Sequence, residues 1–437
     1  MTVKEALKLD SAALNALKNE LKNKMKESKL NAFVGFEEEG SGVPISLKDN
    51  IALKGWPLTC ASDILKGYIS PFSSTAAQRL LDAGFSLLGR TNMDEFAFGS
   101  SGESSFYGPT LNPLDTSRVP GGSSSGAAAA VAAGLSLAAL GSDTGGSIRQ
   151  PASFCGLIGF KPSYGRISRY GLAQYAGSLD CIGLITQDID DCLLLYSTLA
   201  GKDEKDATSL DEDPALKEVD RPLKICVLDN LFALACPALQ EALAAKITAL
   251  KAAGHEIIHA NLDESEQDLA CYYVIASAEA STALGRYDGV RFGQRAKEVN
   301  SLNELYQKTR TQFFGENAKR RILLGTLMLS RFGYEQYFLQ AQRARTALCT
   351  KYAKLFKNAD LLLLPSAAGE AFGLNTKRDA KEAMIDDIFT IGANLAGLAA
   401  ISLPAGKGEN GLPLGMQLYA APRAESILFA GARAFLD

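Results

Sequence analysis

The chain has 437 residues, of which 47% are hydrophobic and 22% are charged, and its formal net charge is −4. This composition is typical of a globular protein with a large core. Acidic residues outnumber basic ones, so the chain lacks the surplus of basic residues that nucleic-acid-binding proteins use. The cluster of Lys319, Arg320 and Arg321 is typical of a solvated helix face.

The sequence contains neither a signal-peptide core near its start nor an apolar run of the roughly 18 residues that a membrane span requires. Its eight cysteines are scattered and form no CxxC pair. Together these features predict a cytoplasmic protein with reduced thiols and no membrane segment.

The hydrophobic pattern alternates between helical and strand-like periods. In the first part of the chain we expect helices over 4–28, 74–83 and 127–140, strands over 43–52 and 85–88, and Gly/Ser-rich loops over 99–126 and 141–147. Farther along we expect helices over 190–200 and 237–253, strands over 223–228, 256–260, 361–365 and 400–404, and a largely helical part over about 262–356. This alternation predicts an α/β protein with a mostly parallel or mixed sheet.

Two Gly/Ser-rich loops flank the Ala-rich segment, with the sequences GGSSSG at 121–126 and GSDTGGS at 141–147. Successive main-chain N–H groups in such a turn can point at one spot and form an oxyanion hole, beside which a serine can attack a carbonyl. A phosphate loop would need a lysine after the glycines, and neither loop has one. From the spacing alone, a catalytic serine and a purely structural turn remain equally open.

A nucleophilic serine needs a base, and the two histidines, His255 and His259, lie far along the chain in a predicted strand. Lys48 lies in the apolar run 43–50, where burial would lower the pKa of its amine and allow it to act as a base. The alternative is that Lys48 forms an ion pair with a nearby carboxylate.

The two loops, the segment between them and the upstream lysine resemble the amidase signature family, with Ser123 75 positions after Lys48 and Ser147 24 positions after Ser123. The resemblance implies a single α/β domain over 1–437, with an N-terminal helix within 1–30 and a mixed sheet covered by helices on both faces. It assigns Ser147 as the nucleophile, Ser123 as a proton relay that follows a cis peptide, and Lys48 as the base. The main-chain N–H groups of Thr144, Gly145, Gly146 and Ser147 are the implied oxyanion hole.

Further segments are similar to one branch of that family, the A subunits of glutamyl-tRNA(Gln) amidotransferases, namely 91–97, 119–123, 141–151, 154–156, 164–171, 287–291 and 394–397. In that branch the A subunit hydrolyses glutamine, and the ammonia passes to a B subunit that amidates Glu-tRNA(Gln) or Asp-tRNA(Asn), while a small C subunit clasps both. The resemblance therefore implies partner B and C subunits and tRNA contact mainly through the partner. It implies no metal or cofactor in this chain, with ATP and magnesium on the partner subunit.

The same resemblance assigns Arg345 to the α-carboxylate of glutamine and Asp387 to its α-ammonium, with the alternative that each forms a surface salt bridge. The helical part over about 262–356 is expected to contribute to the substrate pocket. Departures from the family pattern occur at Ser125, Gln294 and Cys181.

The segment 255–259 matches the HExxH zinc pattern, which requires a helix to place both histidines on one face. Gly254 and the isoleucines of this segment favour a strand instead, in which the histidines would lie about 13 Å apart. We therefore expect no metal site there. Two other functions remain, a free-standing amidase acting on a small amide and a non-catalytic scaffold subunit, and the presence of Lys48, Ser123 and Ser147 argues against the scaffold.

Overall fold

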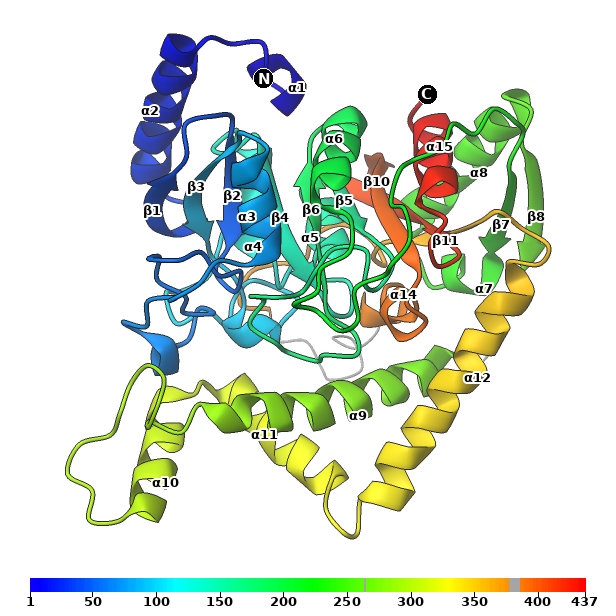
Figure 1. Cartoon of the computed structure of the whole chain (residues 1–437). Coiled ribbons are helices and arrows are strands. Elements are labelled where there is room, and N and C mark those ends of the chain that lie inside the picture. Colours follow the sequence, from blue (N-terminus) through cyan, green and yellow to red (C-terminus); the bar gives the residue numbers. More distant parts are fainter. Residues whose placement is uncertain (263–264, 377–385) are drawn as a thin grey trace.

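A computed structural model describes residues 1–262, 265–376 and 386–437, and these form an α/β fold built on one 11-stranded sheet (Figure 1). The strand order is β1-β3-β2-β4-β6-β5-β10-β11-β9-β7-β8. The strands are β1 Phe33–Glu39, β2 Pro44–Lys48, β3 Ser86–Thr91, β4 Ala138–Asp143, β5 Ile158–Lys161, β6 Cys181–Thr186, β7 Lys224–Leu228, β8 Glu256–Ala260, β9 Leu361–Pro365, β10 Ala399–Lys407 and β11 Pro413–Ala420. Parallel pairs such as β2–β4 and antiparallel pairs such as β4–β6 occur together, so the predicted mixed sheet is confirmed.

Both faces of the sheet are covered, which explains why central strands such as β9 are apolar throughout, whereas the edge strands β1 and β8 carry charged residues. In β9, Leu361 and Leu363 belong to one hydrophobic cluster, while Leu362 and Leu364 belong to another on the opposite face. The covering helices outside the helical part are α2 Ser11–Glu27, α3 Thr75–Asp82, α4 Ser125–Ala132, α5 Arg149–Phe154, α6 Ile189–Leu199, α8 Pro237–Ala252, α14 Ile391–Leu395 and α15 Glu425–Leu436, with the short α1 Val3–Ala6 and α7 Asp229–Phe232. No described helix combines the length and the hydrophobicity that a bilayer span requires.

The expected helical part lies on one side of the sheet, at the bottom of Figure 1. It consists of α9 Ser265–Ala283, α10 Leu302–Phe313, α11 Glu316–Met328 and α12 Leu339–Leu355. Residues 263–264 of the predicted range lie outside the described residues. α11 packs closely on α9 because residue 325 is glycine, where an added Cβ would lie 1.9 Å from the carbonyl oxygen of Ser277.

Two predicted elements are wrong. The helix expected over 4–28 is two helices, α1 and α2, separated by a turn over 7–10. The second difference changes the site. The Ala-rich segment 127–140 is not one helix, because α4 ends at Ala132 and the chain turns at Gly134, where φ is +66°. Residues Ala138–Asp143 instead form β4, which hydrogen-bonds to β2 on one side and β6 on the other. A short apolar run can be either helix or strand, and here the pairing with two neighbouring strands decides. The second Gly/Ser loop therefore begins at the end of a central strand.

Candidate active site

The end of β2 delivers Lys48 into a polar pocket within the core. Its side chain is completely buried, and Nζ lies 2.8 Å from Ser123 Oγ. The hydroxyl oxygens of Ser124 and Ser142 each lie 2.9 Å from the same nitrogen. The predicted approach of Lys48 to Ser123 is therefore present in the structure as a direct hydrogen bond.

No ion pair of the described residues includes Lys48, so the alternative of a carboxylate partner is wrong. The neighbouring Asp49 pairs with Arg90 instead. Burial lowers the pKa of Lys48 to about 7, although buried carboxylates farther away partly oppose this shift. An amine with this pKa is substantially neutral near pH 7 and can accept a proton.

The first Gly/Ser loop contains a cis peptide bond between Gly122 and Ser123, at the position that the sequence predicted. Gly122 has no room for a side chain, since an added Cβ would lie 2.1 Å from Asp94 Oδ2. Asp94 is itself held in place, because its carboxylate accepts hydrogen bonds from the main-chain N–H groups of Gly102 and Ser104. The segment around Asp94 therefore shapes the loop that carries Ser123.

The second Gly/Ser loop places Ser147 beside the first. The N–H of Ser124 donates to the carbonyl of Ser147 at 3.0 Å, which ties the two loops together. Ser147 is buried but retains 8% exposure toward a cavity. No hydrogen bond among the described residues joins the hydroxyls of Ser123 and Ser147, so proton transfer between them requires a small side-chain movement, as is common in enzymes without bound substrate.

The predicted oxyanion hole loses one of its four donors. The N–H of Gly146 donates to Asp143 Oδ1 at 2.8 Å and therefore points away from a substrate. In contrast, the N–H groups of Thr144, Gly145 and Ser147 have no acceptor among the described residues. Buried N–H groups are nearly always paired, so three free donors in one turn indicate a place where an anionic oxygen can bind.

A buried ion pair fixes the shape of this turn. Arg149 and Asp143 are both fully buried, and Nη2 lies 3.1 Å from Oδ1. Burial alone would raise the pKa of Asp143, but the charge and hydrogen bonds of Arg149, together with the charge of Lys161 and the N–H of Gly146, hold the pKa at about 2. Arg149 also donates to Gln417 Oε1 at 2.9 Å and to the carbonyl of Thr390 at 2.9 Å. These contacts tie the turn to β11 and to the segment before α14.

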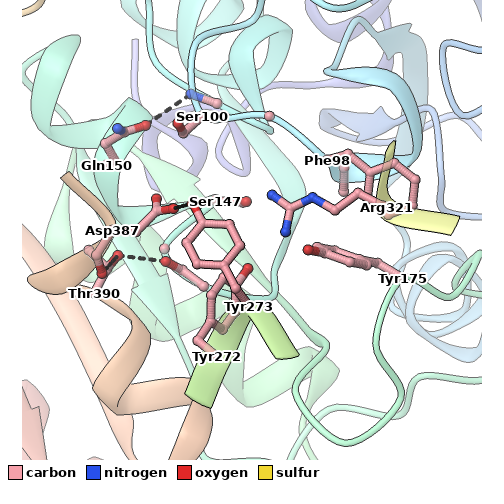
Figure 2. Close-up of a pocket in the computed structure, with 15 residues that line it drawn as sticks. Phe98, Ser100, Ser147, Gln150, Tyr175, Tyr272, Tyr273, Arg321, Asp387 and Thr390 are labelled. Atoms are coloured by element: carbon pink, nitrogen blue, oxygen red, sulfur yellow. Dashed lines mark hydrogen bonds between the residues drawn. The ribbon is translucent and has the colours of Figure 1, made fainter. Parts of the chain in front are cut away.

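A small cavity of about 50 Å³ opens above Ser147 (Figure 2). It is lined by Ala97, Phe98, Gly99, Ser100, Gly122, Gly145, Gly146, Ser147, Gln150, Tyr175, Tyr272, Tyr273, Arg321, Asp387 and Thr390. Two opposite charges, those of Arg321 and Asp387, lie in this wall. Tyr273 contacts both, because its hydroxyl donates to Asp387 Oδ2 at 2.6 Å and its ring centre lies 4.7 Å from Arg321 Cζ.

The Arg321 guanidinium is not fully satisfied within the protein. Its Nη1 is buried and has no hydrogen-bond partner among the described residues. A buried cationic donor without an acceptor is costly, and a ligand with a negatively charged group would satisfy it. The cavity thus combines a nucleophile, free N–H donors, a cation and an anion.

A family model described as Amidase matches residues 11–429. The chain belongs to the amidase family. It is 53% identical to the A subunit of the glutamyl-tRNA(Gln) amidotransferase of Nitratiruptor sp., over 99% of this chain and 98% of that one. The corresponding A subunit of Campylobacter hominis is 50% identical with the same coverage. Among solved structures, the A subunit of the Thermotoga maritima enzyme matches with a TM-score of 0.84 and 37% identity over 99% of this chain and 94% of that one.

The assignment of Arg345 does not fit the geometry of this amidase. Arg345 does not line the described cavity, and all three of its guanidinium nitrogens donate elsewhere. Nε donates to the carbonyl of Leu395 at 2.8 Å, while Nη1 and Nη2 donate to the hydroxyl and carbonyl of Ser178. The guanidinium in the cavity is that of Arg321. Asp387, by contrast, lies in the cavity wall as predicted.

The prediction of a solvated face over residues 319–321 is wrong for Arg321. The helical spacing contains the missing signal, since Ala318, Gly325 and Met328 are the buried residues of α11. Position 321 falls on the same stripe, three residues after 318 and four before 325. A cation on the inward stripe of a helix requires an anionic partner or ligand.

The segment that matches HExxH is a strand and not a helix, as predicted. Glu256–Ala260 form β8, and His255 Nδ1 accepts a hydrogen bond from the N–H of Leu223. His259 contacts Asp229 at 2.8 Å. The described residues of this amidase contain no group of three or more metal-ligating side chains.

The three residues that depart from the family pattern, Cys181, Gln294 and Ser125, each contact another residue of this amidase. All eight cysteines are free thiols, and Cys181 lies 3.9 Å from the fully buried Lys161. The Gln294 side chain donates to the carbonyl of Lys66 and is not part of the described cavity wall. The hydroxyl of Ser125 is buried 3.2 Å from that of Thr110. None of the three contributes a group to the cavity.

Replacing Arg149 with methionine should destabilise the protein by about 3–5 kcal/mol, because Asp143 would remain buried without its counter-ion. The comparison variant is Arg118→Met, which removes a partly exposed ion pair with Asp115 and a hydrogen bond to the carbonyl of Ala371, and should cost about 2 kcal/mol or less. Urea unfolding of both variants measures the difference. Equal losses for the two would show that Arg149 does not hold the turn.

Proposed function

We propose that this chain is the glutamine-hydrolysing A subunit of a tRNA-dependent amidotransferase. It releases ammonia that a partner B subunit uses to convert Glu-tRNA(Gln) to Gln-tRNA(Gln), or Asp-tRNA(Asn) to Asn-tRNA(Asn), with a C subunit completing the complex. The observation that carries the chemistry is the 2.8 Å hydrogen bond from Lys48 to Ser123. Lys48 is fully buried there, and no described carboxylate forms an ion pair with it. The similarity to named A subunits over nearly the whole chain supports the choice of substrate and partners.

In the proposed reaction, Ser147 Oγ attacks the δ-carbonyl carbon of glutamine and its proton passes through Ser123 to the neutral amine of Lys48. The oxyanion that forms is stabilised by the N–H groups of Thr144, Gly145 and Ser147. Lys48 then returns the proton through Ser123 to the departing nitrogen, which leaves as ammonia. Water cleaves the γ-glutamyl ester by the same relay and regenerates Ser147.

The two charges in the cavity match the two charges of the amino-acid end of glutamine. Arg321 has an unpaired buried nitrogen with which to bind the α-carboxylate, and a guanidinium suits a carboxylate because both are planar and can form two parallel hydrogen bonds. Asp387 is the acceptor for the α-ammonium. Between them, the tyrosine-lined wall and the small volume of about 50 Å³ favour a small amide over a polymer.

The remaining steps of the complex belong to the partners. Activation of the aminoacyl-tRNA requires ATP and magnesium, which we assign to the B subunit together with most of the tRNA contact. A cytoplasmic location agrees with this role and with eight unpaired thiols. A free-standing amidase would need the same catalytic groups, and it differs in turning over its substrate fully without any partner.

Replacing Ser147 with alanine should lower glutamine-dependent amidation by the complex by about 10⁴-fold or more, because the nucleophile is lost. Amidation with added ammonia should be largely unchanged, since that step occurs on the partner. Both activities are measured by the formation of amidated tRNA. Loss of both activities would contradict the proposed division of labour.

The pH dependence follows from Lys48, whose pKa is lowered to about 7 by burial. Because the neutral amine is the active form, kcat/KM for glutamine should rise about tenfold per pH unit below pH 7 and level off above it. Asp180, which accepts from Thr144 and whose pKa burial raises to about 6, should steepen the profile below pH 6.

Lys48→Arg should abolish hydrolysis at every pH, because arginine stays protonated. A rate that is flat from pH 6 to 8 would rule out Lys48 as the base.

The two arginines provide a matched pair for testing the substrate contact. Arg321→Ala should raise KM for glutamine by roughly 10–100-fold, since a charge-assisted hydrogen bond contributes about 1.5–3 kcal/mol. Arg345→Ala should leave KM within about threefold, because its guanidinium donates to Ser178 and to the carbonyl of Leu395 and does not line the described cavity. Steady-state kinetics of the complex gives both values, with ammonia-dependent amidation as the control. A larger effect at Arg345 would restore it as the carboxylate ligand.

A further inference from the structure

The buried pocket around Lys48 contains one polar side chain that the proposed reaction does not use. Asn50 follows β2, two residues after Lys48, and is only 3% exposed. Its Nδ2 donates to the hydroxyl oxygen of Ser142 at 2.9 Å. Its Oδ1 is buried and has no hydrogen-bond partner among the described residues. A buried acceptor without a donor costs free energy, so its presence beside the base requires a physical reason.

Asn50 is connected to the base through a single hydroxyl. Ser142 Oγ lies 2.9 Å from Asn50 Nδ2 and also 2.9 Å from Lys48 Nζ, so the three side chains form one chain of hydrogen bonds. All three side chains are buried. Any hydrogen-bond partner that Ser142 needs must therefore come from the side chains around it and not from bulk water.

The direction of each hydroxyl proton decides which form of the amine is favoured. The hydroxyl of Ser124 donates to the carbonyl of Ser142 at 3.2 Å, so its oxygen is left to accept from Lys48. The hydroxyl of Ser142 has no acceptor of its own among the described residues except Lys48 Nζ. While it accepts from Asn50, its proton therefore points to the lone pair of the neutral amine. A hydrogen bond to the neutral form of a group disfavours the charged form.

The requirement reverses once the base has taken a proton. An ammonium group has three N–H donors and no lone pair, so Ser142 must then accept from Lys48 and needs a new acceptor for its own proton. A half-turn of the Asn50 carboxamide would bring Oδ1 to the place of Nδ2, because an amide has a donor and an acceptor at the same reach. The unpartnered Oδ1 is thus available for the protonated state of the base.

We propose that Asn50 is a positioning residue that serves the base through Ser142, as a donor while Lys48 is neutral and as an acceptor once Lys48 is protonated. This inference rests on the proposed function, because it assumes that Lys48 is the base for Ser147. Asn50 touches neither the substrate nor the reacting atoms. Its role follows from the carboxamide, which can supply whichever partner the hydroxyl lacks.

Other charged groups also face the base and must be separated from the effect of Asn50. Burial lowers the pKa of Lys48, and the groups that oppose this shift are the carboxylates of Asp94, Asp143 and Asp180 and the thiol of Cys60. Asp49, which lies between Lys48 and Asn50, pairs with Arg90. All of these groups are retained when only position 50 is substituted, so a shift of the pH profile reports on position 50.

The test measures two pH profiles of the Asn50→Asp variant, kcat/KM for glutamine in the complex and the rate at which a fluorophosphonate labels Ser147 in the full chain. In the labelling reaction Ser147 Oγ bonds to phosphorus, the P–F bond breaks and fluoride leaves, while the proton passes through Ser123 to Lys48. A carboxylate only accepts, and its charge keeps a nearby amine protonated. The midpoint of the acid limb should therefore rise by about one pH unit or more in both profiles, with the rate near pH 9 within about threefold of the unaltered chain.

A second variant should move the midpoint in the opposite direction. Asn50→Leu removes both the donor and the acceptor, and Ser142 then has no acceptor for its proton when Lys48 is protonated. This disfavours the ammonium, so the midpoint should fall. The matched control Asn230→Asp makes the same change near the opposite edge of the sheet, where Asn230 bonds the N–H and carbonyl of Leu262, and should leave the midpoint unchanged. Thermal unfolding shows whether each variant is folded.

The two readouts distinguish failure of this inference from failure of the proposed function. If the fluorophosphonate labels Ser147 but the complex releases no glutamate from glutamine, the proposed function fails, and the labelling profiles alone decide the role of Asn50. An unchanged midpoint in the Asn50→Asp variant, with or without a lower rate at every pH, overturns the role of Asn50 and leaves the proposed function intact. If Asn50→Asp does not fold, the Asn50→Leu variant decides, since a midpoint that does not fall overturns the inference.

Discussion

The proposed chemistry depends on burying one amine that forms no ion pair with any described residue. Lys48 is surrounded by serine hydroxyls that can accept or donate hydrogen bonds but cannot carry a charge at neutral pH. A carboxylate at the same distance would keep the amine protonated, and full exposure to water would do the same. Only a dry, uncharged and polar pocket gives a lysine that can accept a proton near pH 7.

The buried carboxylates nearest that pocket are held by other partners. Burial of the amine lowers the pKa of Lys48 more than the charge of Asp143 raises it, and the carboxylate itself pairs with Arg149 and accepts from the N–H groups of Gly146 and Ile148. The same carboxylate therefore shapes the turn that carries Ser147, in which three other N–H groups have no acceptor among the described residues. Rigid support of this kind is what an oxyanion site requires, because its donors must be in place before charge develops.

The cavity is assembled from segments that are distant in sequence. The catalytic turn comes from the central strands, whereas Tyr273 and Arg321 come from α9 and α11 in the helical part, and Asp387 precedes α14. The close contact of α11 with α9 at Gly325 links the two helical contributors. Under the proposed function, the helices that would select the substrate are separate from the strands that position Ser147, so a common catalytic fold could serve a particular substrate.

Local sequence determined the groups that carry the chemistry. Lys48 in an apolar run, the two Gly/Ser loops with Ser123 and Ser147, and the alternation of strands and helices could all be predicted, because burial, tight turns and periodicity depend on neighbouring residues. Tertiary structure decided the rest. Whether the Ala-rich segment would become helix or strand depended on β2 and β6, and whether Gly146 would face a substrate depended on Asp143. The inward position of Arg321 has a signal in the helical spacing of Ala318, Gly325 and Met328. The position of Arg345 outside the cavity depended on how α12 packs, which places its guanidinium against Ser178 and Leu395.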